Sequence, residues 1–370
     1  DETGVSYETL KRHRAKINRQ LQSFNIKIRL TSTNAYLIGE ESAIRIFYHR
    51  LLLPFTHNNY FFEDYSIHEE HYLYFLTKRI TDGLSVETEQ IFGICWFFIN
   101  SIRIKAGCSI NDFSFEANDP LFSLYAPLLK ELYEKEGVYL QEEEIFFAFF
   151  CFLESWNYNN PLGKNVSKVL TQEYPLLRKN AQEAVQEIAD ALHLQALLQT
   201  NLATNIVLLL LKYAESPVLS KQFQLEYQEL LLQRNDQYAI LAEASTKLFK
   251  RLPQFSTIGD TTYFVNLFSL LGQQAIYTIQ PPSKTVFFIF QSEPSWKAFL
   301  QQELGDLLGK RVNLVPLEIS QLPETMMGAG DLILSNIPLD SMPVPILYLS
   351  TIPTKNELSQ LTELTSHSYL

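Results

Sequence analysis

Cysteine is scarce in this chain. Only Cys95, Cys108 and Cys151 occur in 370 residues, and they are odd in number and far apart. This spacing excludes a disulfide framework, a paired-cysteine zinc site and a redox pair. We therefore expect buried, inert thiols in a reducing cytoplasm, and we predict neither a metal nor a cofactor.

Long apolar runs and phosphate-binding loops are also lacking. The runs at 145–153 and 206–211 are shorter than the roughly 20 residues that cross a membrane, and they are typical of buried helices. Gly328-Ala329-Gly330 lacks the lysine and the helix of a phosphate-binding loop. No local pattern indicates a Ser-His-Asp or Cys-His set. The sequence thus predicts neither a membrane protein nor an enzyme.

The chain does have enough hydrophobic residues to form folded cores, and its charge is unevenly distributed along the sequence. Hydrophobic residues make up 46% and aromatic residues 13% of the chain, enough for two or three folded domains. Residues 1–30 contain seven lysine and arginine residues against three acidic ones, a net charge of +4, although the whole chain carries −11. This contrast favours one segment that binds a polyanion, attached to an acidic body.

The basic segment has the pattern of an amphipathic helix over 6–24. Ser6 is a suitable N-cap, and helical spacing places Leu10, Ile17 and Leu21 on one side, toward a small core. The other side presents cations and hydrogen-bonding groups, as a helix in a DNA major groove must. The residues predicted to contact DNA are Ser6, Thr9, Arg12, His13, Lys16, Arg19 and Gln20.

A hairpin is predicted directly after this helix. Ile26, Ile28 and Leu30 alternate with basic residues, a polar turn follows at 31–34, and a second short strand covers 35–38. A helix followed by a hairpin forms the second half of a winged helix-turn-helix, with the hairpin as the wing. The first helix of that motif has no counterpart here, so we expect the chain to start inside the domain, by N-terminal truncation.

The rest of the chain is predicted to be helical as far as about residue 277 and α/β after that. Clear breaks occur at 157–163 and at 280–283, where proline, glycine and asparagine gather. Candidate helices cover 41–53, 68–80, 86–105, 120–135, 141–155, 165–172, 180–196, 202–214, 217–232, 236–250 and 261–275. Beyond 283, strands at 285–290, 311–315, 331–334 and 345–349 with helices at 294–308 and 354–365 favour a small parallel sheet.

The ordered set of parts resembles the Mga/AtxA family of virulence regulators of Gram-positive bacteria. Three stretches are similar to the family: 6–12 (SYETLKR), 37–41 (LIGEE) with 45–48 (RIFY), and 155–158 (SWNY) with 161–163 (PLG). The resemblance implies a mainly α, multidomain fold in four parts. These are a partial winged helix at 1–40, helical phosphotransferase-regulation (PRD-like) domains at 41–157 and 158–278, and a sugar-transport IIB-like (EIIB-like) α/β domain at 283–370.

The same resemblance implies a function. It predicts a transcription regulator, usually an activator, that binds promoter double-stranded DNA and assembles as a dimer or larger homo-oligomer. Regulation domains of this kind accept phosphate on histidine from phosphorelay proteins, and the candidates here are His68, His71 and His193. The IIB-like segment departs from the working enzyme, because no cysteine nucleophile occurs beyond residue 151. Ser292, which follows the first strand, has no evident activating base.

Two other classes remain open from the sequence. A phosphocarrier of the sugar phosphotransferase system would need a phosphorylatable cysteine or histidine. An RNA-binding antiterminator shares the regulation domains, but it opens with a small β-rich module that the basic helix and hairpin do not resemble.

Overall fold

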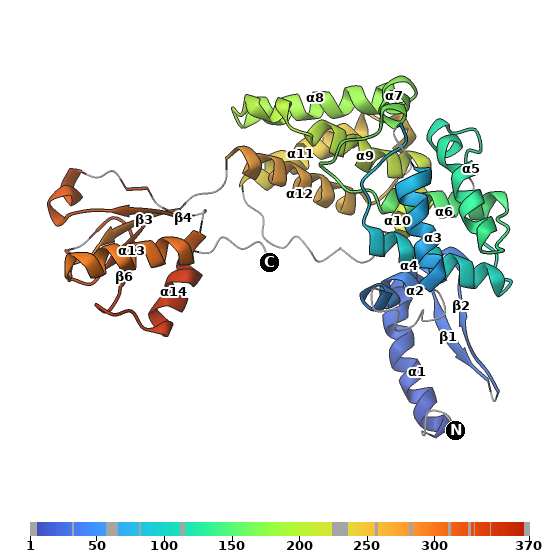
Figure 1. Ribbon diagram of the computed structural model, residues 1–370, viewed down its shortest axis with the longest axis horizontal. Coiled ribbons are helices and arrows are strands. Elements are labelled where there is room, and N and C mark those ends of the chain that lie inside the picture. The colour runs from blue at the N-terminus through green and yellow to red at the C-terminus, as the bar shows by residue number, and fades with distance from the viewer. Residues whose placement is uncertain are drawn as a thin grey trace. The chain divides into compact units, whose positions relative to one another are not determined.

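The computed structural model describes residues 6–365, apart from 32, 57–65, 81–82, 112–114, 224–235, 256–257, 281–283, 310–311, 325–326, 329 and 341. The chain forms two compact units, Asp1–Ala275 and Ile276–Leu370. The first is helical except for one hairpin, and the second contains a small parallel sheet (Figure 1). The predicted fold class, mainly α with a small parallel-sheet region, is therefore confirmed.

Helix α1 (Tyr7–Leu21) opens the first unit, and strands β1 (Lys27–Leu30) and β2 (Ala35–Ile38) follow it as an antiparallel hairpin (Figure 1). Lys27 pairs with Ile38 and Leu30 with Ala35. The loop between the strands is closed by Thr31, whose hydroxyl accepts from the Asn34 amide at 2.9 Å. The predicted helix and hairpin thus form, with boundaries shifted by at most a few residues.

Helix α2 (Glu41–Thr56) belongs to two cores at once. Ala43 and Ile44 pack with Leu21 of α1 and Ile26 before the hairpin in one small apolar cluster. On the opposite side of the same helix, the ring of His49 stacks on Trp96 with centroids 4.1 Å apart. The helical period makes this possible, because residues three or four apart share a face. One rigid helix therefore joins the basic segment to the helical body.

The helical body continues to the end of the first unit. After α2 its helices are α3 (Ser66–Tyr74), α4 (Gln90–Lys105), α5 (Pro120–Lys135), α6 (Glu142–Glu154), α7 (Lys164–Gln172), α8 (Pro175–Ala191), α9 (Leu202–Glu215), α10 (Pro217–Phe223), α11 (Asp236–Lys250) and α12 (Thr262–Ile279). A π-helical turn, Phe75–Arg79, extends α3. The predicted apolar runs lie in α6 and α9, whose phenylalanines and leucines are almost all buried.

Local sequence explains several helix starts. Asp119 caps α5, since its carboxylate accepts from the amides of Leu121 and Phe122 at 2.8 Å each, and Pro120 takes the first helical position. Among the described residues no single helix is long and apolar enough to cross a membrane. Helices α9 and α10 have the required length and hydrophobicity only when they are taken together, and the chain bends by 113° at the break between them.

The second unit is a four-stranded parallel sheet with two flanking helices. Strands β3 (Lys284–Ile289), β4 (Val312–Pro316), β5 (Leu332–Ser335) and β6 (Ile346–Tyr348) lie in the order β4-β3-β5-β6. One face of the sheet packs with α13 (Pro294–Leu308) and α14 (Lys355–Thr365) through Leu300, Leu304 and Leu361. β3 is buried on both faces, as the apolar run at 285–290 predicts.

One helix prediction is wrong at both ends. The helix expected at 180–196 is α8, which starts at Pro175 and ends at Ala191. Proline at the first helical position starts it early. His193 then takes a left-handed conformation, with φ of 52°, and the Leu194 amide donates to the Ala189 carbonyl at 2.8 Å. This pattern ends a helix, so the candidate His193 lies in a turn and not on a helix.

Two further predictions differ from the structure. The helix expected at 86–105 starts only at Gln90, because Thr88 forms an antiparallel bridge with Trp156. Of the helix expected at 217–232, the structure shows α10, and residues 224–232 lie outside the described part of the chain.

Candidate nucleic-acid interface

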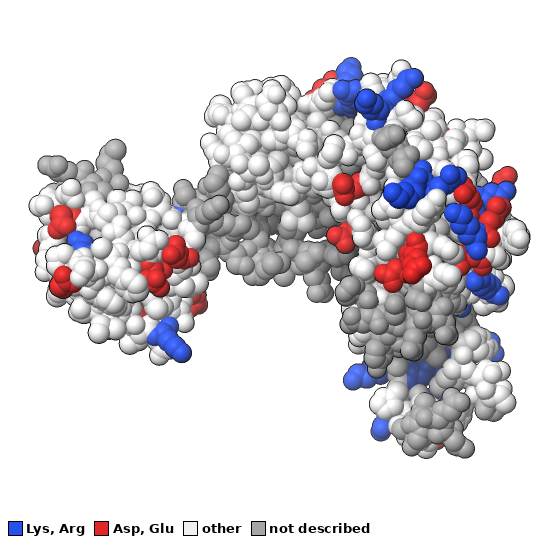
Figure 2. All heavy atoms as spheres, viewed as in Figure 1, with Lys and Arg blue, Asp and Glu red and all other residues white. Residues whose placement is uncertain are grey.

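The outer side of α1 is basic and open to solvent. Of the residues predicted to contact DNA, Thr9 is half-buried, and the others are exposed: Ser6, Arg12, His13, Lys16, Arg19 and Gln20. Figure 2 shows lysine and arginine side chains in the region where Figure 1 places α1 and the hairpin. The described cations of this side form no ion pair with a carboxylate within the described residues, so their charge is available to a polyanion.

Ser6 and Thr9 are engaged within the helix start. The Ser6 hydroxyl accepts from the Thr9 amide at 3.2 Å, and the two hydroxyl oxygens lie 2.9 Å apart. This is the predicted N-cap. The acidic Glu8 in the same turn pairs with Lys11 at 2.8 Å, so Lys11 is the cation of α1 that is neutralised locally. The free positive charge therefore lies farther along the helix, at Arg12, Lys16 and Arg19.

The inner side of α1 differs from the prediction in one residue. Leu21 is buried, but Ile17, which was expected in the core, is 40% exposed. Arg14 and Asn18 are half-buried instead, and Asn18 is hydrogen-bonded to Ile28 of the hairpin. The spacing of apolar residues could not show this, because a residue at the edge of the apolar stripe of a helix is either covered or exposed, depending on what packs beside it.

Asn18 fixes the helix against the hairpin. Its side-chain oxygen accepts from the Ile28 amide at 2.7 Å, and its side-chain nitrogen donates to the Ile28 carbonyl at 3.0 Å. One asparagine thus satisfies both backbone groups of Ile28, as a neighbouring strand would. This role could not be predicted from the sequence, in which Asn18 is only a polar residue on an inward face.

Replacing Asn18 with alanine is expected to lower the free energy of unfolding by about 1–3 kcal/mol, because the Ile28 amide and carbonyl lose their partner. Thermal or urea denaturation measures the loss. Gln20→Ala is the control, since Gln20 is exposed on the same helix and its replacement also gains helix propensity, although less than Asn18→Ala does. Equal stabilities of the two variants would contradict the role of Asn18.

The candidate histidines His68 and His71 lie together on α3 and hold one carboxylate. His68 Nε2 lies 2.8 Å from Glu136 Oε2, and His71 Nδ1 pairs with the other oxygen of Glu136, which follows α5. His68 is buried near the rings of Phe97 and Phe98, and burial lowers its pKa. His193, by contrast, is exposed in its turn at the end of α8. His193 thus lies on another segment than the other two candidates, after α8 and not on α3.

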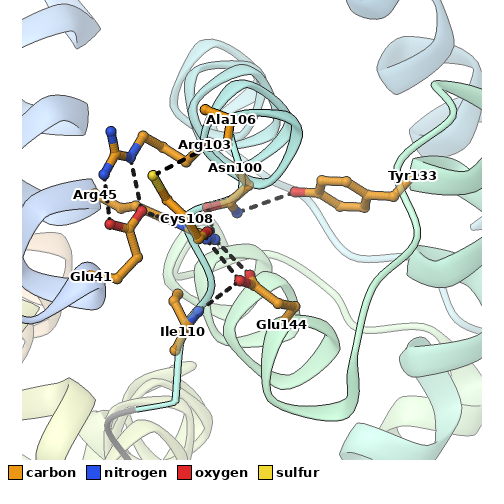
Figure 3. Close-up of polar contacts among 9 residues, drawn as sticks. All are labelled: Glu41, Arg45, Asn100, Arg103, Ala106, Cys108, Ile110, Tyr133 and Glu144. Atoms are coloured by element: carbon orange, nitrogen blue, oxygen red, sulfur yellow. Dashed lines mark hydrogen bonds and ion pairs between the residues drawn. The ribbon is translucent and has the colours of Figure 1, made fainter.

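A buried ionic network fixes α2 in the helical body (Figure 3). The Arg45 guanidinium, which has no exposed surface, donates to both Glu144 carboxylate oxygens at 2.7 and 2.8 Å. It also donates to Glu41 at 3.0 Å, to the Asn100 side chain at 3.2 Å and to the Cys108 carbonyl at 2.9 Å. All five N–H groups of the guanidinium therefore have an acceptor.

The network continues beyond Arg45. Arg103 of α4 forms a bidentate pair with Glu41, with distances of 2.8 and 2.7 Å, and Glu144 also accepts from the Ile110 amide at 2.8 Å. Two arginines and two glutamates thus balance in charge. Burial alone would lower the pKa of Arg45, but the hydrogen bonds and charges of Glu144 and Glu41 outweigh it and raise that pKa. Sequence reasoning missed this cluster, because its members are far apart in the chain.

A second, partly buried cluster joins the two halves of the helical body. The Tyr174 hydroxyl lies 2.6 Å from Asp119, which caps α5, and 3.1 Å from Glu215 at the end of α9. Burial, together with the charge of Asp119, raises the pKa of Glu215 to about 9. A tyrosine hydroxyl has one proton, so Tyr174 donates to one of the two carboxyl groups at a time, and the nearby charge of Asp119 favours the protonated form of Glu215.

In the second unit, the loop after β3 is hydrogen-bonded to the loop after β5. The Gln291 amide donates to the Asn336 side chain at 2.8 Å, and Asn336 donates back to the Gln291 carbonyl at 2.8 Å. Glu293 caps α13 and accepts from the Trp296 amide at 3.0 Å. A carboxylate of the chain itself therefore occupies the N-terminus of α13.

Two family models match the chain. Residues 1–52 match the Mga helix-turn-helix domain, and residues 173–278 match the Non-canonical single-stranded DNA-binding domain. No curated protein matches the chain. The first match ends within α2, so it covers α1, the hairpin and the helix whose residues complete their core.

The second match was not anticipated from the sequence. Single-stranded DNA is usually bound by aromatic side chains on which bases stack, and by free cations. Within the described part of 173–278, however, every aromatic side chain whose exposure is described is buried or half-buried. Several cations there are ion-paired: Lys179 with Glu183, Lys212 with Glu154, Lys247 with Glu243, and Arg251 with Glu187.

The described cations on the outer side of α1 thus form an open basic face, within the segment that matches the Mga helix-turn-helix domain. Together, the two family matches support a DNA-binding regulator of transcription that has an Mga-type helix-turn-helix domain at its N-terminal end.

Proposed function

We propose that this chain is a transcription activator of the Mga/AtxA type that binds promoter double-stranded DNA through α1, with the β1–β2 hairpin as its wing. The observation that carries this proposal is the division of α1 into two sides. Its inner side packs on the hairpin and α2, and its outer side presents exposed cations with no carboxylate partner in the described structure. A helix of this kind fits the major groove of B-DNA.

The residues of the outer side have different roles in this proposal. Arg12, Lys16 and Arg19 neutralise phosphates, and the arginines are also able to contact guanine edges. His13 and Gln20 reach other base edges. Ser6 and Thr9 act near the helix start, where the amide groups of the first turn favour a phosphate.

The hairpin adds a second, smaller contact. Lys27 and Arg29 are exposed on β1, and the Arg29 guanidinium lies 5.9 Å from the centroid of the exposed Tyr36 ring. In the proposed complex these side chains follow the DNA backbone beside the groove that α1 enters. Asn18 keeps the two contacts at a fixed spacing.

The remaining parts are proposed to regulate and assemble the protein. The division into a partial winged helix at 1–40, PRD-like domains at 41–157 and 158–278 and an EIIB-like domain at 283–370 belongs to this proposal. The last three parts hold copies together as a homodimer or larger assembly in the cytoplasm. A two-fold assembly suits DNA half-sites about one helical turn, roughly 34 Å, apart.

Phosphoryl transfer is not part of this proposal. His68 and His71 already share the Glu136 carboxylate, and a phosphate on either ring would add negative charge next to it. Glu293 occupies the start of α13 in the EIIB-like unit. The assignment of His68, His71 and His193 as phosphorylation sites stays a prediction from the family resemblance.

The test of the proposed function is the double variant Arg12→Ala with Lys16→Ala in a protein that has all its DNA-binding elements. If both side chains contact phosphates, the slope of log affinity against log salt is expected to fall by about 1.8, at roughly 0.9 per contact. Affinity at fixed salt is expected to fall at least tenfold. Titration of a labelled promoter fragment at several salt concentrations measures both.

The control for this test is Lys11→Ala. It removes the same charge from the same helix, but Lys11 is paired with Glu8 and lies on the other side of α1. Lys16→Ala alone should therefore weaken binding more than Lys11→Ala does. A double variant with unchanged affinity and unchanged salt slope would reject α1 as the DNA-reading helix.

A further inference from the structure

A cavity in the second half of the helical body lies apart from the proposed DNA contact. It has a volume of about 260 Å³ and is formed where α7, α8 and the start of α9 meet. This volume is below the roughly 300–1,000 Å³ of pockets that hold drug-sized ligands. The cavity therefore suits a small molecule.

The rim of the cavity is polar and carries one cation. Arg178 and Gln182 come from one face of α8, Ser167 and Thr171 from one face of α7, and Thr204 from α9. Arg178 Nη1 donates to the Thr171 hydroxyl at 2.8 Å, which orients the guanidinium. Within the described structure Arg178 forms no ion pair.

The floor of the cavity is apolar. Val207 and Leu170 are buried, and Leu162 is half-buried. A ligand bound here would thus place a carbon skeleton against these side chains and polar groups toward the rim. Because the lining contains no aromatic residue, it offers no surface on which a nucleic-acid base could stack.

The charge around the rim favours an anion with more than one negative charge. Lys164 and Lys168 are exposed on α7, on the side next to the stripe that lines the cavity. Figure 2 shows lysine and arginine side chains gathered over the region where Figure 1 places α7 and the adjacent end of α8. Arginine binds phosphate groups in a bidentate manner, and hydroxyl and amide side chains complement hydroxyl groups.

We propose that the cavity between α7, α8 and α9 is a binding site for a small organic phosphate that carries hydroxyl groups. Arg178 binds the phosphate, Lys164 and Lys168 add to the attraction, and Ser167, Thr204 and Gln182 bind the hydroxyl groups. This proposal does not rest on the DNA-binding function, because it concerns a different part of the chain.

Titration calorimetry on the full chain tests the site with glycerol 1-phosphate as the probe and glycerol as its uncharged counterpart. Glycerol 1-phosphate is expected to bind at low salt, and glycerol at least tenfold more weakly. Arg178→Gln is expected to lower the affinity for glycerol 1-phosphate at least tenfold. Thr204→Trp, at the exposed rim, is expected to block the cavity and abolish binding.

Lys179→Gln is the matched control, since Lys179 neighbours Arg178 in sequence, is exposed and does not line the cavity. It is expected to change affinity by less than twofold. Circular dichroism of each variant separates loss of the site from loss of the fold. The proposal is overturned if the wild type does not bind glycerol 1-phosphate, or if Arg178→Gln and Lys179→Gln weaken it equally. A (dT)10 oligonucleotide that binds in its place and loses affinity with Arg178→Gln would also overturn it, in favour of a nucleic-acid site.

Discussion

Replacing Arg45 with alanine is expected to destabilise the first unit by about 3–5 kcal/mol, the usual cost of breaking a buried ion pair. The reason is the state of Glu144 after the change. Its carboxylate is only 3% exposed and would lose both guanidinium hydrogen bonds while remaining buried. Asn100 and the Cys108 carbonyl would lose a donor at the same time.

Denaturant unfolding followed by far-UV circular dichroism measures this loss. Arg79→Ala is the matched control, because Arg79 also pairs with a glutamate, Glu131, but both side chains are about 40% exposed. A surface pair of this kind contributes only about 0–1 kcal/mol. Arg45→Met combined with Glu144→Met should recover much of the lost stability, since no unpaired charge is then left in the core. A loss for Arg45→Ala no larger than that for Arg79→Ala would contradict this account of the network.

Glu215 is expected to make the protein less stable as the pH rises from about 4.5 toward 9. Its pKa is raised from 4.5 to about 9 in the folded state. Between these two values the folded chain holds a proton that the unfolded chain releases, so each pH unit favours unfolding by up to about 1.4 kcal/mol. The contribution of the Glu215 proton to stability is fully present below pH 4.5, and it is lost as the pH rises through the folded-state pKa of about 9.

Glu215→Gln removes this dependence, because an amide does not ionise and its carbonyl oxygen is still able to accept from the Tyr174 hydroxyl. The variant is expected to exceed the wild type in melting temperature at pH 8, and by much less at pH 5. Glu173→Gln serves as the control, since Glu173 is exposed next to Tyr174. Parallel stability curves for wild type and Glu215→Gln over pH 5–9 would rule out a buried proton at this junction.

Much of the local structure could be predicted because its signals are local. Asp119 and Pro120 indicate the start of α5 by capping and by the preference of proline for the first helical position. The alternation around Ile28 indicates the hairpin in the same way. The end of the helix expected at 180–196 was predicted wrongly, because the helix ends before His193, whose backbone is in the left-handed conformation. Histidine adopts this conformation only occasionally.

The candidate site could be predicted only in part for a related reason. Period and charge identified the outer side of α1, but Asn18 depends on where Ile28 comes to lie. The Arg45 network could not be predicted, since Arg45 and Glu144 are 99 positions apart and each is unremarkable in its own segment. The junction of Asp119, Tyr174 and Glu215 likewise exists only after the helices have packed.

The packing of α2 in two cores at once has a consequence for regulation. Ala43 and Ile44 pack in the core beneath α1, while the Arg45 guanidinium of the same helix donates to Glu144, Asn100 and Cys108 of the helical body, so no flexible joint separates the two. Any event in the body that tilts α2 also changes the angle at which α1 meets a duplex. Thermodynamic reciprocity then requires that DNA, once bound, alters the affinity of the body for the molecule that caused the tilt.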